Sequence, residues 1–200
     1  MNIEIQSGSE ARTRTLADTL AASLQGGDLV ALEGPLGAGK TCFVRGLAEG
    51  LGIDPRQVSS PTFVLVHEYD GGRLLLVHVD AYRIEDVAEL AGIGWDELIG
   101  DREAIVAVEW AGRVAAALPE RRITVRLAHV DQNERCVTII APAGMADRLA
   151  GFPEELRRMA RPRCAICDGE VAEDSEAFPF CSPRCQLVDL GNWMGQKYRI

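Results

Sequence analysis

A glycine-rich octapeptide at residues 34–41 constrains the fold of this 200-residue chain more than any other feature. It reads Gly-Pro-Leu-Gly-Ala-Gly-Lys-Thr and matches the pattern G-x-x-x-x-G-K-S/T at every fixed position. Residues 28–33, directly before it, have the apolar character of a buried parallel strand, and a helix is predicted directly after it. A strand, a glycine-rich loop and a helix in this order predict a phosphate-binding loop in an α/β fold.

The residues of this loop predict how ATP would bind. Glycines allow backbone N–H groups to close around phosphates, and the N-terminus of the following helix adds partial positive charge. Lys40 would supply a charge to the β- and γ-phosphates, and the hydroxyl of Thr41 could bind Mg²⁺. A chance glycine turn is the alternative, and the strand and helix on either side argue against it. The residues predicted to bind the nucleotide are Gly34, Gly37, Ala38, Gly39, Lys40, Thr41, Cys42 and Asp80.

Two acidic residues could complete a metal site. Asp80 and Glu109 each follow directly on an apolar run with the character of a strand. A carboxylate at the end of a strand beside the phosphate loop can face Mg²⁺ without disturbing the sheet. Either residue alone could equally be a solvated strand end, but the two together favour the metal. His67 and His78 lie inside predicted strands, and we expect them to be packed or hydrogen-bonded without a catalytic role.

The remaining apolar patterns predict a mixed central sheet. Residues 9–25 form an amphipathic helix, with Ser9 as its N-cap and Gly26-Gly27 as its end. Two hairpins are predicted where pairs of apolar runs flank short turns: 63–69 with 73–79, and 123–130 with 135–140. Because hairpins pair antiparallel strands and residues 28–33 predict a parallel one, the sheet should contain both directions.

The composition disfavours a protein that binds nucleic acid by itself or spans a membrane. The chain has 21 basic and 30 acidic residues, a net charge of −9, and no clustered basic stripe. Its one local basic excess, at Arg157, Arg158, Arg161 and Arg163, is typical of a solvated linker. No run of about 18 to 20 apolar residues could span a membrane, and residues 1–10 lack the regions of an export signal. We therefore expect a soluble protein of the cytoplasm.

Four of the six cysteines have the spacing of a structural zinc site. They form two pairs, Cys164-x2-Cys167 and Cys181-x3-Cys185. Disulfides are the alternative, which a chain without an export signal disfavours. Cys42 and Cys136 are then expected to be reduced thiols.

These patterns divide the chain into two domains. We predict a P-loop domain at 1–145, a polar linker at 146–163 and a zinc-binding module at 164–200. The module is short and has few aliphatic residues, so metal binding should supply much of its folding free energy.

Five segments, taken in chain order, resemble the TsaE family of P-loop ATPases. They are the loop 34–41, Ser59-Ser-Pro-Thr-Phe63, His78-Val-Asp-Ala-Tyr-Arg83, Glu89-Leu90 and Val108-Glu-Trp110. The loop motif occurs in many nucleotide-binding proteins, whereas its combination with the other segments is specific to this family. The resemblance covers about residues 1–145.

The resemblance implies an activity and a set of site residues. TsaE proteins support the formation of N6-threonylcarbamoyladenosine at position 37 of tRNA, in a complex with TsaB and the catalytic subunit TsaD. By this resemblance Lys40 and Thr41 bind phosphate and Mg²⁺, Asp80 is the acidic residue beside the nucleotide, and Glu109 is a metal ligand. Residues 60–62 would form a loop that responds to the nucleotide, with the Thr62 hydroxyl near the metal or the γ-phosphate. Because this subunit need not hold tRNA itself, an acidic chain agrees with that role.

These segments leave open the rate of ATP hydrolysis, the kinase alternative and the residue that contacts adenine. No residue is an evident arginine finger, so we expect the chain alone to hydrolyse ATP slowly. A small-molecule kinase with the same loop is the alternative enzyme, although it would need a lid carrying cations that the sequence does not show. Arg135, in the second hairpin, is a candidate for contact with adenine.

Residues 164–200 resemble the YacG family of zinc-binding DNA gyrase inhibitors. The shared features are the cysteine pairs, Phe180-Cys-Ser-Pro-Arg-Cys185, Leu187-Val-Asp-Leu-Gly-Asn-Trp193 and the ending Tyr198-Arg-Ile200. The resemblance implies that zinc is held by Cys164, Cys167, Cys181 and Cys185, and that DNA gyrase is a partner. The loop between the cysteine pairs departs from the family pattern, because it is about two residues shorter and holds acidic but no basic side chains. A zinc-module regulator of gyrase is thus a second hypothesis, compatible with the ATPase role.

Overall fold

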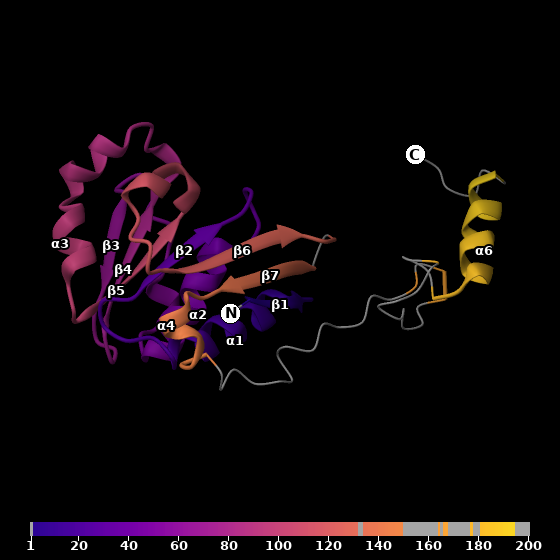
Figure 1. The fold of residues 1–200 in the computed structure, drawn as a ribbon, viewed down its shortest axis with the longest axis horizontal. Coiled ribbons are helices and arrows are strands. Elements are labelled where there is room, and N and C mark those ends of the chain that lie inside the picture. The colour runs from indigo at the N-terminus through magenta and orange to yellow at the C-terminus, as the bar shows by residue number, and fades with distance from the viewer. Residues whose placement is uncertain are drawn as a thin grey trace. The chain divides into compact units, whose positions relative to one another are not determined.

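The computed structural model describes residues 2–131, 134–149, 164, 166, 167, 177 and 181–194. The chain divides into two compact units, residues 1–157 and 158–200. The first unit is an α/β fold around a seven-stranded mixed sheet, which confirms the predicted fold class (Figure 1). Most of the predicted linker lies outside the described residues, so the domain boundaries stay predictions.

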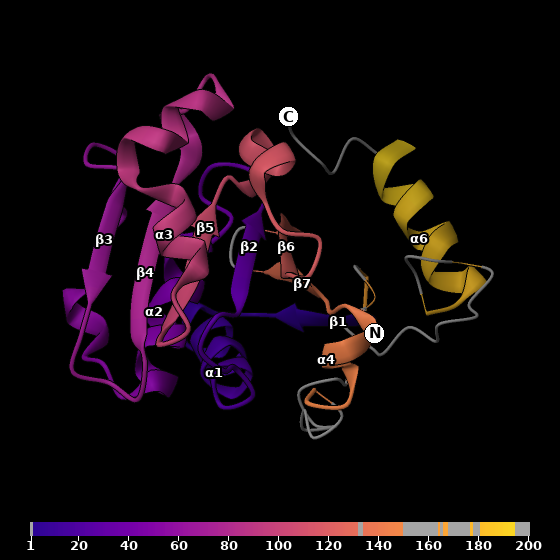
Figure 2. The ribbon, with the colours of Figure 1, turned by 60° about the vertical axis from the view of Figure 1, so that its left-hand side comes forward.

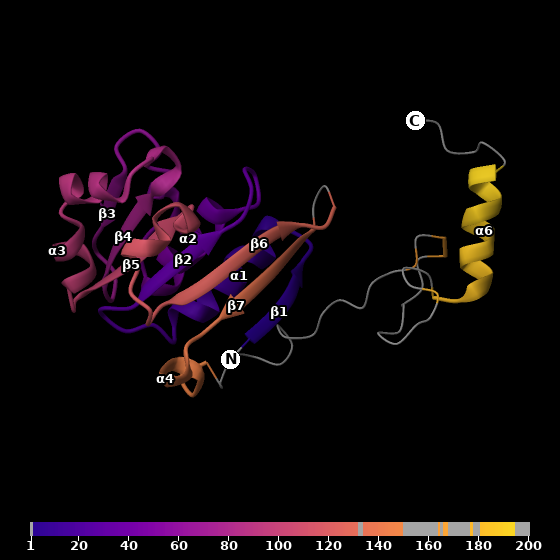
Figure 3. The same ribbon diagram turned by 45° about the horizontal axis from the view of Figure 1, so that its top comes forward.

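The sheet is parallel in its centre and antiparallel at its edges. Its strands are β1 (Asn2–Ser7), β2 (Leu29–Glu33), β3 (Val66–Tyr69), β4 (Leu75–Asp80), β5 (Ala104–Glu109), β6 (Ile123–His129) and β7 (Arg135–Ile140). They lie in the order β1-β7-β6-β2-β5-β4-β3. The strands β6, β2, β5 and β4 are parallel, whereas β3, β7 and β1 pair antiparallel with their neighbours. Figure 3 shows β6, β7 and β1 side by side.

Helices cover both faces of the sheet. The α-helices of the first unit are α1 (Glu10–Ala21), α2 (Lys40–Leu51), α3 (Trp95–Gly100) and α4 (Ala143–Ala146), and its 3-10 helices are η1 (Pro55–Gln57), η2 (Ala81–Arg83), η3 (Val87–Ile93) and η4 (Ala111–Ala117). Alternate residues of the buried strands face opposite layers, so Leu32 packs with α1 and α2 while Ala31 packs with α3 and η4. Figure 2 shows α3 lying across β4 and β5. The second unit contains α6 (Pro183–Met194).

The two predicted hairpins are confirmed, although the first is shorter than expected. The strand β3 begins only at Val66, because the N–H groups of Val64 and Leu65 both bond to the carbonyl oxygen of Pro61 in a turn. Leu65 adopts a left-handed backbone with φ of 69°. The segment after Thr62 is therefore a loop that lies beside the end of β4, where the N–H of Asp80 donates to Leu65.

The helix α1 begins as predicted and ends earlier. The Oγ of Ser9 accepts a hydrogen bond from the N–H of Arg12 at 3.1 Å, which confirms the N-cap. The helix ends at Ala21, so its predicted end at Gly26-Gly27 is wrong. A Cβ at Gly26 would lie 1.8 Å from the carbonyl oxygen of Arg102, so this glycine serves a close backbone contact instead. Among the described residues, no helix is long and apolar enough to cross a membrane.

Candidate nucleotide and metal sites

The predicted phosphate loop connects β2 to α2, and its backbone requires glycine. Gly34, Gly37 and Gly39 have φ values of 146°, 75° and 102°, a region that other residues rarely adopt. A Cβ at Gly34 would also lie 2.3 Å from the carbonyl oxygen of Leu127 on β6. Ala38 is fully buried, and its N–H donates to Pro35 at 3.2 Å. The loop is thus shaped by backbone geometry and by close contact with the neighbouring strand.

Lys40, the first residue of α2, folds back onto this loop. Its Nζ donates hydrogen bonds to the carbonyl oxygens of Gly34 and Pro35 at 2.9 and 2.8 Å. The same nitrogen lies 3.8 Å from the ring centroid of Trp110, a cation–π contact. Burial lowers the pKa of Lys40, while the carboxylates of Glu109 and Asp80 act in the opposite direction. The lysine therefore lies where the loop would need a cation, close to both predicted acidic residues.

Thr41 and Glu109 are in direct contact, so their oxygen atoms lie close enough to bind one metal ion. The Oγ1 of Thr41 donates to Oε1 of Glu109 at 2.7 Å. The Nε2 of His78 lies 2.9 Å from the same oxygen. No described residue donates a hydrogen bond to the second carboxylate oxygen, Oε2. A hydroxyl and a carboxylate from two different elements thus present oxygen atoms, which Mg²⁺ prefers, next to the phosphate loop.

Asp80, at the end of β4, ties down the loop that contains Thr62. Its Oδ2 accepts hydrogen bonds from the hydroxyls of Ser60 and Thr62 at 2.7 and 2.6 Å. Its Oδ1 accepts the N–H of Tyr82 at 2.9 Å. Because β4 and β5 are parallel, with Asp80 beside Glu109, both carboxylates lie at the same edge of the sheet. The structure therefore brings together Lys40, Thr41, Thr62, Asp80 and Glu109.

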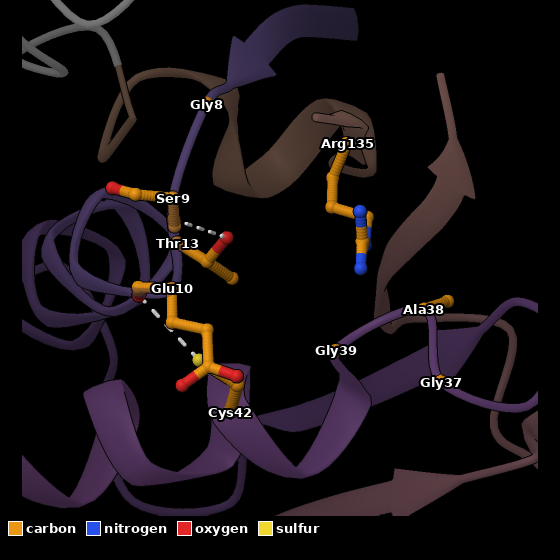
Figure 4. Close-up of a pocket in the computed structure, with 9 residues that line it drawn as sticks. All are labelled: Gly8, Ser9, Glu10, Thr13, Gly37, Ala38, Gly39, Cys42 and Arg135. Atoms are coloured by element: carbon orange, nitrogen blue, oxygen red, sulfur yellow. Dashed lines mark hydrogen bonds between the residues drawn. The ribbon is translucent and has the colours of Figure 1, made fainter. Parts of the chain in front are cut away.

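A cavity of about 350 Å³ lies beside the phosphate loop. It is lined by Gly8, Ser9, Glu10, Thr13, Gly37, Ala38, Gly39, Cys42 and Arg135. Figure 4 shows the Arg135 side chain extending into the space between the start of α1 and the loop. The Cys42 Sγ donates to the carbonyl oxygen of Glu10 at 3.5 Å, and burial together with the Glu10 charge raises the pKa of this thiol. Cys42 thus adds no negative charge beside the loop.

The comparison with known families agrees with this geometry. Residues 7–137 match the family model described as "Threonylcarbamoyl adenosine biosynthesis protein TsaE", which covers most of the first unit. The chain belongs to the TsaE family. Its relatives carry that name with the words tRNA threonylcarbamoyladenosine biosynthesis, so the family takes part in this tRNA modification.

Individual TsaE proteins match along most of their length. The Bacillus subtilis protein is 41% identical over 146 residues, which are 73% of this chain and 88% of that protein. The Streptomyces coelicolor protein is 44% identical over 141 residues, which are 68% of this chain and 93% of that protein. The crystal structure of Bacillus subtilis YdiB superposes with a TM-score of 0.60 at 31% identity, covering 78% of this chain and 94% of that one. The fold described above therefore has a counterpart in a solved structure.

Sequence reasoning missed His78 as a member of this TsaE site. It was expected to be a packed or hydrogen-bonded residue, and it is both, but its partner is the predicted metal ligand Glu109. The period of a strand could have found it, because His78 lies two residues before Asp80 and so shares a face with it. Ser9, Glu10 and Thr13 were also missed as lining of the cavity, since their place beside the loop depends on how α1 packs.

The second unit brings together the four predicted zinc ligands. The Sγ atoms of Cys164, Cys167, Cys181 and Cys185 all lie within 4.8 Å of one another. Tetrahedral zinc with Zn–S bonds of about 2.3 Å separates its sulfurs by roughly 3.8 Å, so the cluster has a fitting size. All six cysteines are free, and the structure gives no support to the disulfide alternative.

The hydrogen bonds around these sulfurs shift the pKa values of two of the thiols in opposite directions. Backbone hydrogen bonding from Cys181 and from Ile166 lowers the pKa of Cys164 to about 6. In contrast, side-chain hydrogen bonds with Cys167 and Cys185 raise the pKa of Cys181 to about 12. Four sulfurs this close can all become thiolates only when a cation compensates their charge. Residues 162–200 match the family model described as "DNA gyrase inhibitor YacG", which agrees with a zinc-binding module.

Proposed function

We propose that this chain is the Mg²⁺-dependent ATPase subunit required for N6-threonylcarbamoyladenosine modification at position 37 of tRNA, acting with TsaB and TsaD. The observation that carries this proposal is the contact of Thr41 with Glu109 at the start of α2, directly beside Lys40. This contact brings a predicted metal ligand on β5 next to the phosphate loop, in a chain of the TsaE family.

The nucleotide would occupy the phosphate loop and the adjoining cavity. Gly34, Gly37, Ala38, Gly39 and Lys40 offer the loop's N–H groups and its ammonium to the phosphates. Thr41 and Cys42 follow in the first turn of α2, where the helix dipole favours anions. The cavity lined by Ser9, Thr13 and Arg135 then receives the adenosine part.

The oxygen atoms of Thr41 and Glu109 would hold Mg²⁺. The Thr41 proton is donated to Glu109, so the hydroxyl lone pairs remain for a cation, and Oε2 of Glu109 accepts no hydrogen bond from the described residues. When bound, the metal neutralises phosphate charge. Asp80 lies next to this pair and holds Thr62, whose hydroxyl is close enough to the site to respond to the γ-phosphate.

The chain alone should hydrolyse ATP slowly. Arg83 and Arg113 are the guanidinium groups near the aromatic residues of the site, and each is already engaged. Arg83 lies 5.6 Å from the Phe63 ring centroid, and Arg113 lies 5.7 Å from that of Tyr82 while it donates to Ile84. Phosphoryl transfer needs cations aimed at the developing charge, so a partner that reorganises this region would raise the rate.

Exposed apolar residues beside the site fit such a protein partner. Leu36 at the tip of the phosphate loop is 80% exposed, and Phe63, directly after Thr62, is 87% exposed. Both side chains extend from loops that carry predicted site residues, where a protein partner could cover them. We assign this surface to TsaB and TsaD, with tRNA contacted only through the complex.

Two measurements test the proposal. Mass spectrometry of tRNA nucleosides from depleted cells should show loss of threonylcarbamoyladenosine, restored by the wild-type chain but not by Lys40→Ala. Purified chain should hydrolyse ATP slowly, and addition of TsaB with TsaD should change that rate. Unchanged tRNA, together with rapid phosphorylation of an added metabolite, would favour the small-molecule kinase instead.

For the second unit we propose a structural zinc site that presents a protein-binding module. DNA gyrase is the candidate partner, from the description of the matching family model. Inhibition of gyrase supercoiling by the zinc-loaded chain, and none by the Cys181→Ser variant, would support this role. We also propose that the protein is located in the cytoplasm, because it would act in tRNA modification and because its cysteines are free.

A further inference from the structure

His78 occupies a position where an apolar side chain would be expected. It lies on β4 and is 0% exposed, on the face of the sheet that also carries the buried Leu76, Ile105 and Ala107. Its nearest polar contact is Nε2 with Oε1 of Glu109, at 2.9 Å. The parallel register places His78 opposite Ala107, so it reaches Glu109 diagonally across the pair of strands.

The contact with Glu109 determines which ring nitrogen carries the proton. An ionised carboxylate only accepts hydrogen bonds, so Nε2 is the donor. The other nitrogen, Nδ1, is buried and has no hydrogen-bond partner among the described residues. A tautomer with its proton on Nδ1 would bury an unsatisfied N–H donor and turn the lone pair of Nε2 toward the carboxylate, so the tautomer with its proton on Nε2 fits its surroundings.

The unpartnered Nδ1 indicates that the ring serves Glu109 rather than the core. Burial of a polar atom without a partner is unfavourable, and an apolar side chain would fill the same space without that penalty. The one evident stabilising polar interaction of the imidazole at this position is thus its hydrogen bond to Oε1 of Glu109. Residues that orient a metal ligand through such a bond commonly influence metal affinity.

The two donors on Oε1 restrict the carboxylate in a specific way. Thr41 and His78 both donate to Oε1, which fixes the carboxylate between α2 and β4. The oxygen left without a described donor is Oε2. The proton of Thr41 points to Oε1, so the lone pairs of its hydroxyl are left for a cation.

We infer that His78 is a positioning residue, whose Nε2–H holds Oε1 of Glu109 and thereby orients this carboxylate and the Thr41 hydroxyl for Mg²⁺. The inference rests on the proposed Mg²⁺–nucleotide site and adds to it a residue that touches neither metal nor nucleotide. It also predicts that the hydrogen-bond donor, not the aromatic ring, is what the site needs.

Two substitutions of His78 distinguish the effect of its hydrogen-bond donor from the effect of its packing. His78→Leu removes the donor and keeps an apolar side chain, whereas His78→Gln places an amide N–H near the position of Nε2. Mn²⁺ serves as the probe, and its binding to the full chain with saturating ADP is measured by electron paramagnetic resonance. We expect His78→Leu to weaken Mn²⁺ binding about tenfold, and His78→Gln to remain within about threefold of the wild type. ADP affinity without metal should stay within about twofold in both, because His78 has no contact with the phosphate loop in the described structure.

A matched control and a second readout decide between the outcomes. His67→Leu changes the neighbouring histidine on β3, whose Nδ1 contacts Tyr69 rather than Glu109, and should leave Mn²⁺ binding unchanged. Wild-type Mn²⁺ binding in His78→Leu, or an equal loss in the Gln and Leu variants, would overturn the positioning role. A parallel loss of metal-free ADP affinity would show a structural role instead.

The wild-type protein provides a test that needs no variant to fold. Nitrogen NMR of the His78 ring should show the proton on Nε2, and a proton on Nδ1 would overturn the inference. If the wild-type chain with ADP binds no Mn²⁺, the proposed metal site fails and the inference fails with it. If the wild-type chain binds Mn²⁺ and only the His78 results disagree, the proposed site stands and the inference alone is wrong.

Discussion

The ammonium of Lys40 is held by groups that a phosphate could replace. Two carbonyl oxygens of the loop accept its protons, and neither carries a full charge. Phosphate oxygens would make stronger, charge-assisted bonds with the same donor. The retracted position of Lys40 on the loop is therefore compatible with a role in binding the β- and γ-phosphates.

Lys40→Ala should remove most ATP binding. Loss of a charged hydrogen-bond donor costs about 1.5 to 3 kcal/mol, which corresponds to roughly 10- to 150-fold in affinity. Isothermal titration calorimetry with ATP measures this directly. Arg126→Ala is a suitable control, because it also removes one positive charge near the loop, where Arg126 pairs with Glu33, yet should bind ATP normally. Wild-type affinity in Lys40→Ala would refute the phosphate-loop assignment.

Glu109→Ala should weaken Mg²⁺-dependent turnover more than metal-free nucleotide binding, because we assign this carboxylate to the metal. Glu109→Gln keeps the size of the side chain and protects the fold, since His78 and Thr41 both depend on this residue. In either variant, we expect the gain in nucleotide affinity that Mg²⁺ provides to be about tenfold smaller than in the wild type. Nucleotide affinity with and without Mg²⁺ is the measurement, with Glu33→Gln as the control. Equal losses under both conditions would indicate a structural carboxylate.

Residues whose role depends on local sequence were predicted better than those with distant partners. Lys40 and Thr41 belong to a motif with a known mechanism, and the structure places them together as expected. The contact of His78 with Glu109 spans 31 positions and depends on how β4 and β5 pair, which a single histidine in an apolar run does not indicate. Ser9 was predicted as a helix cap, but its second role in the cavity requires the packing of α1 beside the loop.

At the scale of elements, α1 and α2 cross closely because two glycines of α2 face α1. A Cβ at Gly46 would lie 2.4 Å from the carbonyl oxygen of Arg14 and 2.6 Å from the Cβ of Ala17. At Gly50, the carbonyl oxygen of Asp18 would be 2.6 Å away. Because α2 begins at the phosphate loop, the position of α1 against it also determines the shape of the nucleotide cavity.

Gly46→Ala should therefore destabilise the first unit. The gain in helix propensity is about 1 kcal/mol, whereas overpacking of a tight contact costs about 1 to 3 kcal/mol, and a clash with backbone lies at the upper end. We expect a net loss of about 1 to 2 kcal/mol in urea unfolding followed by circular dichroism. Gly100→Ala in α3 is the matched control, since nothing lies within 4 Å of its Cβ, and it should be neutral or slightly stabilising. An unchanged urea midpoint for Gly46→Ala would show that α1 and α2 can move apart without loss of stability.

The elements that sequence reasoning missed or misplaced share a physical cause. The strand β1 was not predicted, because it is a short edge strand with alternating burial that depends on pairing with the distant strand β7, near the other end of the first unit. The end of α1 was placed at Gly26, although that glycine is needed for contact with Arg102. The buried strands β2 and β5, by contrast, have continuous apolar runs and were predicted from them. Local pattern was sufficient for the strands buried on both faces and for the two hairpins, and insufficient where a distant partner decides.

At the scale of the whole molecule, the two units depend on different sources of stability. The first has buried apolar clusters on both faces of its sheet. The second has four clustered cysteines, and structural zinc in small domains contributes about 10 to 16 kcal/mol of apparent binding free energy. The chain divides between them at residues 157 and 158. Loss of zinc should thus affect one unit and spare the other.

Cys181→Ser tests this separation, because it removes one of four ligands from a site that needs all of them. We expect loss of bound zinc and of hydrogen-exchange protection in α6, since metal binding and folding are one process in so small a domain. ATP affinity should stay within about twofold of the wild type, because the first unit keeps its own core. Zinc content, ATP affinity and hydrogen exchange are measured on the same variant, with Cys136→Ser on β7 as the control that should retain zinc. If ATP affinity fell together with the zinc, the two units would be energetically coupled, and an independently folded partner-binding module would have to be rejected.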